Sequence, residues 1–279
     1  MEQTRIKTSL KENAVKNAFA NSGIYELIAD PIVLNTESAL EQILDDPQLP
    51  IQEKSKAVYD NTCNIINELF ESEITPEKIH EAKSSINAML SGVISNKITI
   101  TSLIKVSNYD YYTYTHCVNV AVYSIGLAKE LGMSNKELEL IGAGGILHDL
   151  GKSRVDIGIV NKPGKLTESE FTEMKNHPIY GYEILQEQHE TDEVILTCVR
   201  HHHEKVNGAG YPDRIKDQDL SVYARIVAIC DIFDALSTKR SYKPALSTFE
   251  TLNMMNTKLK DELDSKLLKV FIRMMGRCE

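Results

Sequence analysis

Apolar residues recur at helical spacing along most of the chain, and the clearest examples lie between residues 53 and 94. There they form two stripes of the kind that packs one face of a helix into a core. The first stripe contains Val58, Thr62, Ile65, Ile66 and Leu69, and the second contains Ile79, Ala82, Ile86, Met89 and Val93. These spacings predict two amphipathic helices.

Helix-start signals continue the pattern towards the C-terminus. Thr75 before Pro76 is typical of a cap followed by a first helical turn. A Ser or Thr followed three residues later by Glu, which predicts a capping box, occurs at Ser134 with Glu137, Thr167 with Glu170, and Ser247 with Glu250. Gly132 and Gly151 fall where the preceding helices should stop.

A sheet finds little support in the sequence. Polar and apolar residues alternate only weakly, over Ile98–Ile104, and no longer stretch has the period of a strand. We therefore predict an all-α helical bundle with one long loop near residues 203–220. Residues 1–50 show no motif and predict a small helical segment.

Composition and charge narrow the class of protein. The 279 residues include 31 basic and 40 acidic side chains, which gives a net charge of −9. This charge argues against DNA, RNA or an anionic membrane as the main partner. Five widely spread cysteines and the lack of a long apolar run favour a reduced, cytoplasmic protein.

Histidines and aspartates interrupt the apolar helices in an unusual way. Asp149 follows His148 at the end of an apolar stretch, and Asp231 is surrounded by Ile229, Cys230 and Ile232. Burying carboxylates is costly unless they are paired or coordinate a metal. Two such carboxylates on separate helices, with several imidazoles elsewhere in the chain, predict a metal site inside the bundle.

The order of the motifs resembles the HD-GYP family, a branch of the HD metallohydrolases. His148-Asp149 lies within HDLGK, His177-Pro178 precedes Gly181, and His202-His203-Glu204 leads into Gly210-Tyr211-Pro212. The segment from Ala224 to Lys243 matches the same family. The resemblance implies a bundle of the HD-domain type over residues 91–279, preceded by an N-terminal helical segment, residues 1–90, of unknown and conceivably regulatory role.

The resemblance also implies site residues. The metal ligands would be His116, His148, Asp149, His177, His202, His203 and Asp231. Asp149 and Lys152 would be catalytic, Lys152, Arg240 and Lys243 would bind substrate phosphate, and Gly210, Tyr211 and Pro212 would form an interaction loop. His201, His80 and His189 are expected to lie outside the site, and Cys117 and Cys230 in the core.

Two departures from the family pattern matter. A subgroup of the family binds a third metal through a Glu one helical turn before the first His, but Tyr112 stands at that place here. We therefore expect two divalent metal ions, with iron or manganese favoured by the resemblance. After Pro212 the family commonly continues with Gly-Leu, whereas this chain has Asp213-Arg214-Ile215.

The implied activity is a metal-dependent phosphodiesterase that hydrolyses cyclic di-GMP to the linear dinucleotide pGpG through a hydroxide activated by two metals, with further cleavage to GMP left open. The alternative is a catalytically weak cyclic di-GMP sensor or interaction module that binds diguanylate cyclase (GGDEF) domains. A general HD nucleotidase or alarmone hydrolase is a third option. Besides the cyclic dinucleotide, candidate partners are GGDEF domains and a second copy of the chain.

Overall fold

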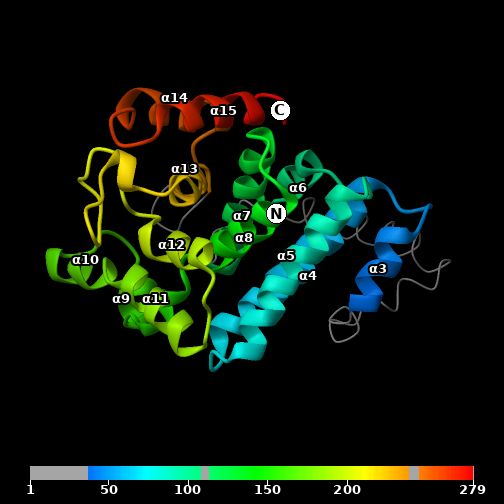
Figure 1. Cartoon of the computed structure of the whole chain (residues 1–279), viewed down its shortest axis with the longest axis horizontal. Helices are drawn as coiled ribbons and strands as arrows, with labels where there is room; N and C mark the ends of the chain where they lie inside the picture. Colours follow the sequence, from blue (N-terminus) through cyan, green and yellow to red (C-terminus); the bar gives the residue numbers. More distant parts are fainter. Residues whose placement is uncertain (1–36, 108–112, 239–244, 279) are drawn as a thin grey trace, which may run out of the picture.

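The computed structural model describes residues 37–107, 113–238 and 245–278, with side chains from residue 40 onward (Figure 1). Within these ranges the regular structure is helical and contains no strand, which confirms the all-α prediction. The α-helices are α3 (Glu37–Asp45), α4 (Ile51–Glu71), α5 (Pro76–Ile94), α6 (Ile100–Val106), α7 (Thr113–Glu130), α8 (Asn135–Leu147), α9 (Ile157–Val160), α10 (Glu168–Met174), α11 (His177–Glu187), α12 (Glu193–His201), α13 (Val222–Ser237), α14 (Thr248–Lys258) and α15 (Ser265–Met275). Two 3₁₀ helices, η1 (Leu150–Arg154) and η2 (Asp217–Asp219), complete them.

The two predicted stripes bury the facing sides of α4 and α5. Each of their apolar members is buried, and Thr62 is buried as well. Thr75 caps α5 as expected, because its side chain accepts the backbone N–H of Lys78. The two helices form a long pair on one side of the bundle (Figure 1).

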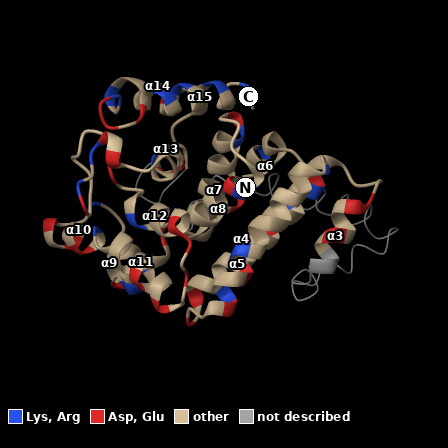
Figure 2. Cartoon of the chain, viewed as in Figure 1, with Lys and Arg blue, Asp and Glu red and all other residues tan. Residues whose placement is uncertain are grey.

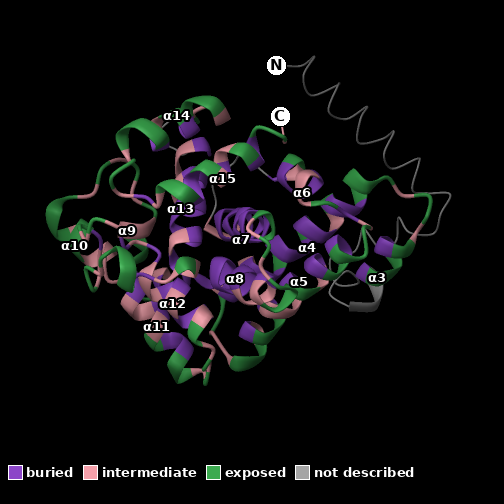
Figure 3. Cartoon of the chain, turned by 45° about the horizontal axis from the view of Figure 1, so that its top comes forward, coloured by how far each residue is buried: buried purple, intermediate pink, exposed green. Residues whose placement is uncertain are grey.

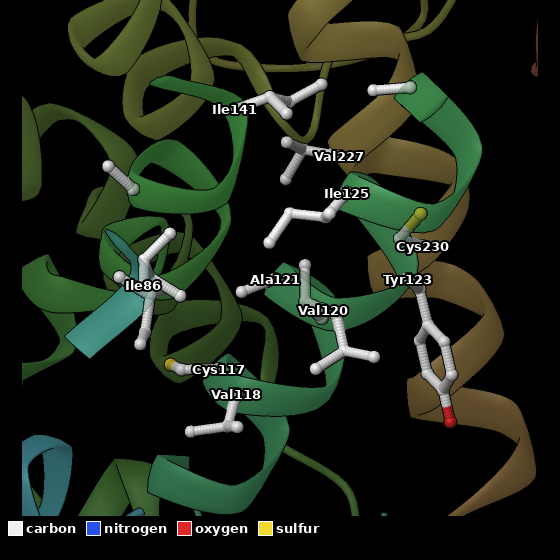
Figure 4. Packing of buried hydrophobic residues seen from close by; sticks show 14 of the residues in the cluster. Ile86, Cys117, Val118, Val120, Ala121, Tyr123, Ile125, Ile141, Val227 and Cys230 are labelled. Atoms are coloured by element: carbon white, nitrogen blue, oxygen red, sulfur yellow. The ribbon is translucent and has the colours of Figure 1, made fainter. Parts of the chain in front are cut away.

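The centre of the bundle is the antiparallel pair of α7 and α8. Figure 3 shows both helices as largely buried, and Figure 2 shows that charged side chains lie mainly on the helices around them. Figure 4 shows side chains of α7, such as Cys117 and Ile125, packed near Ile86 of α5 and Val227 of α13. Burial of this apolar surface is the main stabilising contribution to the fold.

The three predicted capping boxes are all present. Ser134, Thr167 and Ser247 begin α8, α10 and α14, and each accepts the backbone N–H of the Glu three residues later. The weak alternation over Ile98–Ile104 does not form a strand. Thr99 and Ser102 form a fourth capping box there, which starts α6 at Ile100. Local side-chain capping thus overrides a short alternating pattern.

The two glycines expected to stop helices behave differently. Gly132 follows α7 with φ +76°, the left-handed conformation of a helix terminus. Gly151 instead lies inside η1, four residues after α8 ends at Leu147. A Cβ at Gly151 would lie 1.9 Å from the carbonyl oxygen of His177, so this glycine allows η1 to pack closely on α11.

The expected long loop spans residues 203–220 and contains only η2 as regular structure. Within the described ranges, no helix combines the length and apolar character needed to cross a membrane. The division after residue 90 stays a prediction, and that position falls inside α5.

Candidate metal centre

The structure brings together all seven predicted metal ligands, which we call the His–Asp cluster. They come from the first turn of α7, the end of α8, the start of α11, the end of α12 and the middle of α13. The cluster consists of His116, His148, Asp149, His177, His202, His203 and Asp231. Most of its side chains are buried, although His203 keeps 27% of its side-chain surface exposed.

Asp149 lies between two halves of the cluster. Its Oδ2 atom is 3.6 Å from His116 Nε2 and 3.4 Å from His148 Nε2, whereas its Oδ1 atom is 3.3 Å from His177 Nε2. Asp231 Oδ1 lies 3.1 Å from His116 Nε2. In the described part of the chain, the potential ligand atoms of His116, His148 and Asp231 lie within 4.8 Å of one another, as do those of His177, His202 and His203.

The imidazole rings are oriented through their Nδ1 atoms. His148 Nδ1 is 2.7 Å from the carbonyl oxygen of Gly145, His177 Nδ1 is 2.7 Å from that of Met174, and His202 Nδ1 is 2.9 Å from that of Val199. A carbonyl oxygen only accepts, so each Nδ1 carries the proton and each Nε2 carries a lone pair. The lone pairs therefore face the interior of the cluster.

This arrangement fits bound cations. His177 Nε2 and His202 Nε2 are 3.1 Å apart, which places two lone pairs against each other unless a positive charge lies near both. His148 Nε2 is buried and makes no hydrogen bond with the described residues. Buried imidazole nitrogens and carboxylates, with no thiolate among them, form the donor set of a site for divalent metals.

The electrostatics of the cluster favour neutral imidazoles beside ionised carboxylates. Burial lowers the pKa of His177 to about 3 and that of His203 to about 4. Burial alone would raise the pKa of Asp149, but the Lys152 ammonium and the His148 ring outweigh it and hold that pKa well below its usual value. At neutral pH these imidazoles are therefore neutral and the Asp149 carboxylate is ionised, which are the protonation states that bind a metal.

Lys152 lies at the edge of the cluster. Its Nζ atom is 2.5 Å from Asp149 Oδ2, and 17% of its side-chain surface is exposed. The other two predicted phosphate-binding residues, Arg240 and Lys243, fall outside the described residues, as does Tyr112, on which the expectation of two metals rests.

The residues expected to lie outside the site do so. His201 Nε2 is 2.9 Å from Asp213 Oδ2, away from the cluster, and His80 and His189 are exposed. Cys117 and Cys230 are fully buried core residues. Burial raises the pKa of both thiols, which makes them poor ligands and nucleophiles.

The predicted interaction loop folds back onto the cluster. The Tyr211 ring packs against the His203 ring with 4.7 Å between centroids. Gly210 is required there, because a Cβ at this position would lie 2.5 Å from Glu204 Cα. Glu204 itself is buried, and its Oε1 atom accepts the backbone N–H groups of Asp213, at 2.6 Å, and Arg214, at 2.8 Å. The Glu of the HHE motif thus orders the chain that follows Pro212.

The departure after Pro212 has a visible backbone consequence. Arg214 has φ +57°, in the left-handed region that favours glycine. Beside it, the loop, α10 and the start of α11 line a cavity of about 590 Å³. Its lining includes the cationic side chains of Lys175, Lys205 and Arg214, the rings of Phe171 and Tyr211, and no carboxylate.

Two buried residues that contact the cluster were not predicted from the sequence. Asp234 Oδ2 lies 2.7 Å from His116 Nδ1, and Asn119 Nδ2 donates to Asp234 Oδ1 at 2.8 Å. Each stands three residues after a predicted ligand on the same apolar helix, Asp234 after Asp231 and Asn119 after His116. Spacing of one helical turn is the signal that could have found them.

The sequence model of the HD domain family matches residues 101–267, well over half of the chain. The chain belongs to the HD domain family. This match, and relatives named cyclic di-GMP phosphodiesterases, confirm the resemblance to the HD-GYP branch.

Among curated relatives, the HD-domain chain is similar to the cyclic di-GMP phosphodiesterase PA4108 of Pseudomonas aeruginosa, with 31% identity over 70% of this chain and 47% of the relative. It shares 42% identity with the response regulator RpfG of Xanthomonas campestris, named a cyclic di-GMP phosphodiesterase, over 43% of this chain and 32% of the relative. It shares 41% identity with a 3′3′-cGAMP-specific phosphodiesterase of Vibrio cholerae over 47% of this chain and 25% of the relative. The chain thus spans less than half the length of these relatives.

Among solved structures, the HD-domain chain is similar to Bd1817, an HDG"Y"P protein from Bdellovibrio bacteriovorus. The TM-score is 0.72 at 21% identity, and the similarity covers 85% of this chain and 76% of the other. This likeness confirms the helical fold of the HD-domain type.

Proposed function

We propose that the protein is a metal-dependent phosphodiesterase that hydrolyses cyclic di-GMP to linear pGpG. The observation that carries the proposal is the position of Asp149, whose two carboxylate oxygens face ligand nitrogens of different halves of the cluster. One carboxylate placed in this way can hold two divalent ions side by side. Relatives named as cyclic di-GMP phosphodiesterases support the choice of reaction.

The ligand set divides between two ions. His116, His148 and Asp231 would hold the first, His177, His202 and His203 the second, and Asp149 both. When bound, two such ions lower the pKa of water and neutralise phosphate charge. We propose iron or manganese, because nitrogen and oxygen donors without thiolates suit either metal.

The protein's own residues would receive the phosphodiester. Lys152 stands beside Asp149 with part of its side chain exposed, so its ammonium can reach a phosphate oxygen at the edge of the cluster. We propose the same role for Arg240 and Lys243. Hydrolysis forms one bond from water oxygen to phosphorus and breaks one P–O3′ bond, so that the ring opens and the 3′-hydroxyl leaves with a proton.

The neighbouring cavity supports a dinucleotide rather than a single nucleotide. It adjoins the cluster through Tyr211 and offers aromatic surface together with the cations of Lys175 and Arg214. The third cation, Lys205, is paired with Glu262 at 2.7 Å. A molecule with two phosphates and two bases presents the complementary charges and flat faces. An acidic protein with a net charge of −9 would in this way keep a locally positive site for an anionic substrate.

The test compares substrates on metal-loaded protein. The chain, reconstituted with Fe²⁺ under anaerobic conditions or with Mn²⁺, should convert cyclic di-GMP to pGpG faster than it converts 3′3′-cGAMP, nucleoside monophosphates or nucleoside polyphosphates. Asp149→Ala should be inactive, whereas Asp60→Ala, which removes an exposed aspartate of α4, should be fully active. If metal-loaded protein binds cyclic di-GMP tightly but forms no product, the proposed phosphodiesterase activity is refuted and a sensor function is favoured.

Other parts of the expected biology stay predictions. They are GGDEF-domain binding by Gly210, Tyr211 and Pro212, self-association, the absence of a nucleic-acid or membrane partner, and a cytoplasmic location.

A further inference from the structure

Four buried polar side chains from three helices form a continuous hydrogen-bonded line into the His–Asp cluster. Tyr59 of α4 donates its O–H to Asn119 Oδ1 of α7 at 2.7 Å, and Asn119 Nδ2 donates to Asp234 Oδ1 of α13 at 2.8 Å. Asp234 Oδ2 lies 2.7 Å from Nδ1 of His116. Tyr59, Asn119, Asp234 and His116 are each at most 2% exposed. We call this line the Tyr59 relay.

The chemistry of the groups gives the relay a single direction. The Asp234 carboxylate can only accept, so Asn119 must present its NH₂ group to Asp234 and its carbonyl oxygen to Tyr59. Asp234 then accepts from His116 as well, which places the His116 proton on Nδ1. The Nε2 lone pair of His116 is left facing Asp149 and Asp231.

His116 needs a partner of this kind because of its place in the chain. His148, His177 and His202 each lie beside the C-terminal end of a helix, where backbone carbonyls are left without helical partners and can accept from Nδ1. His116 is the fourth residue of α7, where the carbonyl oxygens are taken up by the next helical turn. Asp234 of α13 supplies an acceptor from another helix.

The relay also reaches beyond the region that matches the HD domain family. Tyr59 lies on α4, whereas the match begins at residue 101. Tyr59 packs within the apolar core, beside Val58 of the predicted stripe. A phenol buried at this depth needs a hydrogen-bond partner, and the relay provides it.

We propose that Tyr59 is a positioning residue of the metal centre, and that α4 completes the centre through Asn119 and Asp234. The Asp234 carboxylate is held by Asn119, which is in turn held by Tyr59. A carboxylate positioned in this way fixes the tautomer and orientation of the ligand imidazole and makes it a stronger ligand. The inference rests on the proposed function only in treating the His–Asp cluster as a metal site.

Titration of metal-free protein with Mn²⁺ alone tests the proposal. Tyr59→Phe removes one oxygen atom and keeps the ring. It should lower the affinity for one of the two Mn²⁺ ions about tenfold, while the other ion binds as in wild type. Asn119→Ala breaks the same relay from α7 and should give the same selective loss. Thr62→Val is the matched control, because it removes a buried hydroxyl of α4 that donates to the carbonyl of Val58.

A second readout needs neither metal nor substrate. In metal-free protein labelled with ¹⁵N-histidine, the Nδ1 atom of His116 should carry a proton, because Asp234 accepts from it. Tyr59→Phe and Asn119→Ala should shift the ring-nitrogen resonances of His116 and leave those of His148, His177 and His202 in place, and Thr62→Val should shift none. Unchanged His116 resonances and unchanged Mn²⁺ affinity in both relay variants would overturn the proposal.

The two proposals can fail separately. Wild-type protein that binds Mn²⁺ but leaves cyclic di-GMP intact would refute the proposed reaction and not the relay. Protein that hydrolyses cyclic di-GMP, with metal affinities that do not depend on Tyr59 or Asn119, would refute the relay and not the reaction.

Discussion

The histidines of the His–Asp cluster are oriented by two different means. His148, His177 and His202 each use a backbone carbonyl three residues earlier, at the C-terminal end of a helix. His116, in the first turn of α7, uses a carboxylate from α13 that is tied through α7 to α4. The first device is local, and the second depends on the packing of three helices.

The two devices have different structural requirements. The local device is complete once a helix ends at the right residue, so it survives changes elsewhere in the bundle. The device at His116 requires that α4, α7 and α13 pack in register, which couples one metal position to the stability of the whole core.

The largest effect is expected where the two halves meet. Asp149→Ala should remove both metal ions and lower the turnover of cyclic di-GMP by more than about 100-fold, the upper range for changes one layer further from the metal. Metal analysis of protein purified anaerobically, together with a turnover assay, measures both. One ion retained at full occupancy would show that the halves bind independently of Asp149.

Acid should destabilise the metal-free protein through His177 and His202, two of the histidines that are oriented by backbone carbonyls. Burial lowers the pKa of His177 to about 3 and that of His202 well below its usual value of 6.5. Below pH 6.5 the unfolded chain gains protons at these histidines that the folded chain does not gain, so stability is complete above that pH. It falls as the pH drops towards 3, by at most about 1.4 kcal/mol per pH unit for each histidine.

Denaturant unfolding of metal-free protein between pH 7 and pH 4 measures this loss. His177→Gln should flatten the pH dependence, whereas His80→Gln, at an exposed histidine, should not. A free energy of unfolding that stays constant across this range would contradict the account.

Asp234→Asn should affect one half alone. It replaces the carboxylate beside His116 by an amide, so the ion held by His116, His148 and Asp231 should bind about 10–100-fold more weakly. The ion held by His177, His202 and His203 should keep its affinity. Mn²⁺ titration resolves the two sites. Equal weakening of the binding of both ions would contradict a relay that acts on only one of them.

The smallest effect is expected at Arg214, which lies beside the cavity and does not orient any imidazole of the cluster. Arg214→Gly relieves the φ of +57° but adds freedom to the unfolded chain, so the net gain in stability should be below about 1 kcal/mol. It also removes a cation, which should raise KM for cyclic di-GMP. Arg214→Ala should raise KM equally without the gain in stability, and a lower KM in either variant would exclude Arg214 from substrate binding.

The fold was predictable where the signals were local. The capping boxes at Ser134, Thr167 and Ser247 and the stripes of α4 and α5 are present as expected. The weak alternation over Ile98–Ile104 is not a strand, because alternation over so few residues competes poorly with the cap at Thr99. The role of Gly151 was hidden because it depends on the approach of α11, which no local pattern records.

The site residues were likewise predictable where they stand in local motifs. His148, Asp149 and the His202-His203 pair stand in compact motifs, and the structure brings them together with His116, His177 and Asp231. Asp234 and Asn119 stand in the same helices but look like ordinary core-facing polar residues until α7 and α13 are packed. Tyr59 is sixty residues from its partner Asn119 and belongs to no motif, so only the tertiary structure connects them.

The requirement for two metal ions is tested most directly by measuring metal content and turnover on one anaerobic preparation of the wild-type chain. We expect two divalent ions per chain, both removed by chelation. Conversion of cyclic di-GMP to pGpG should be lost when the ions are removed and regained when they are restored. Turnover that persists after both ions are gone, or two bound ions without turnover, would contradict this expectation.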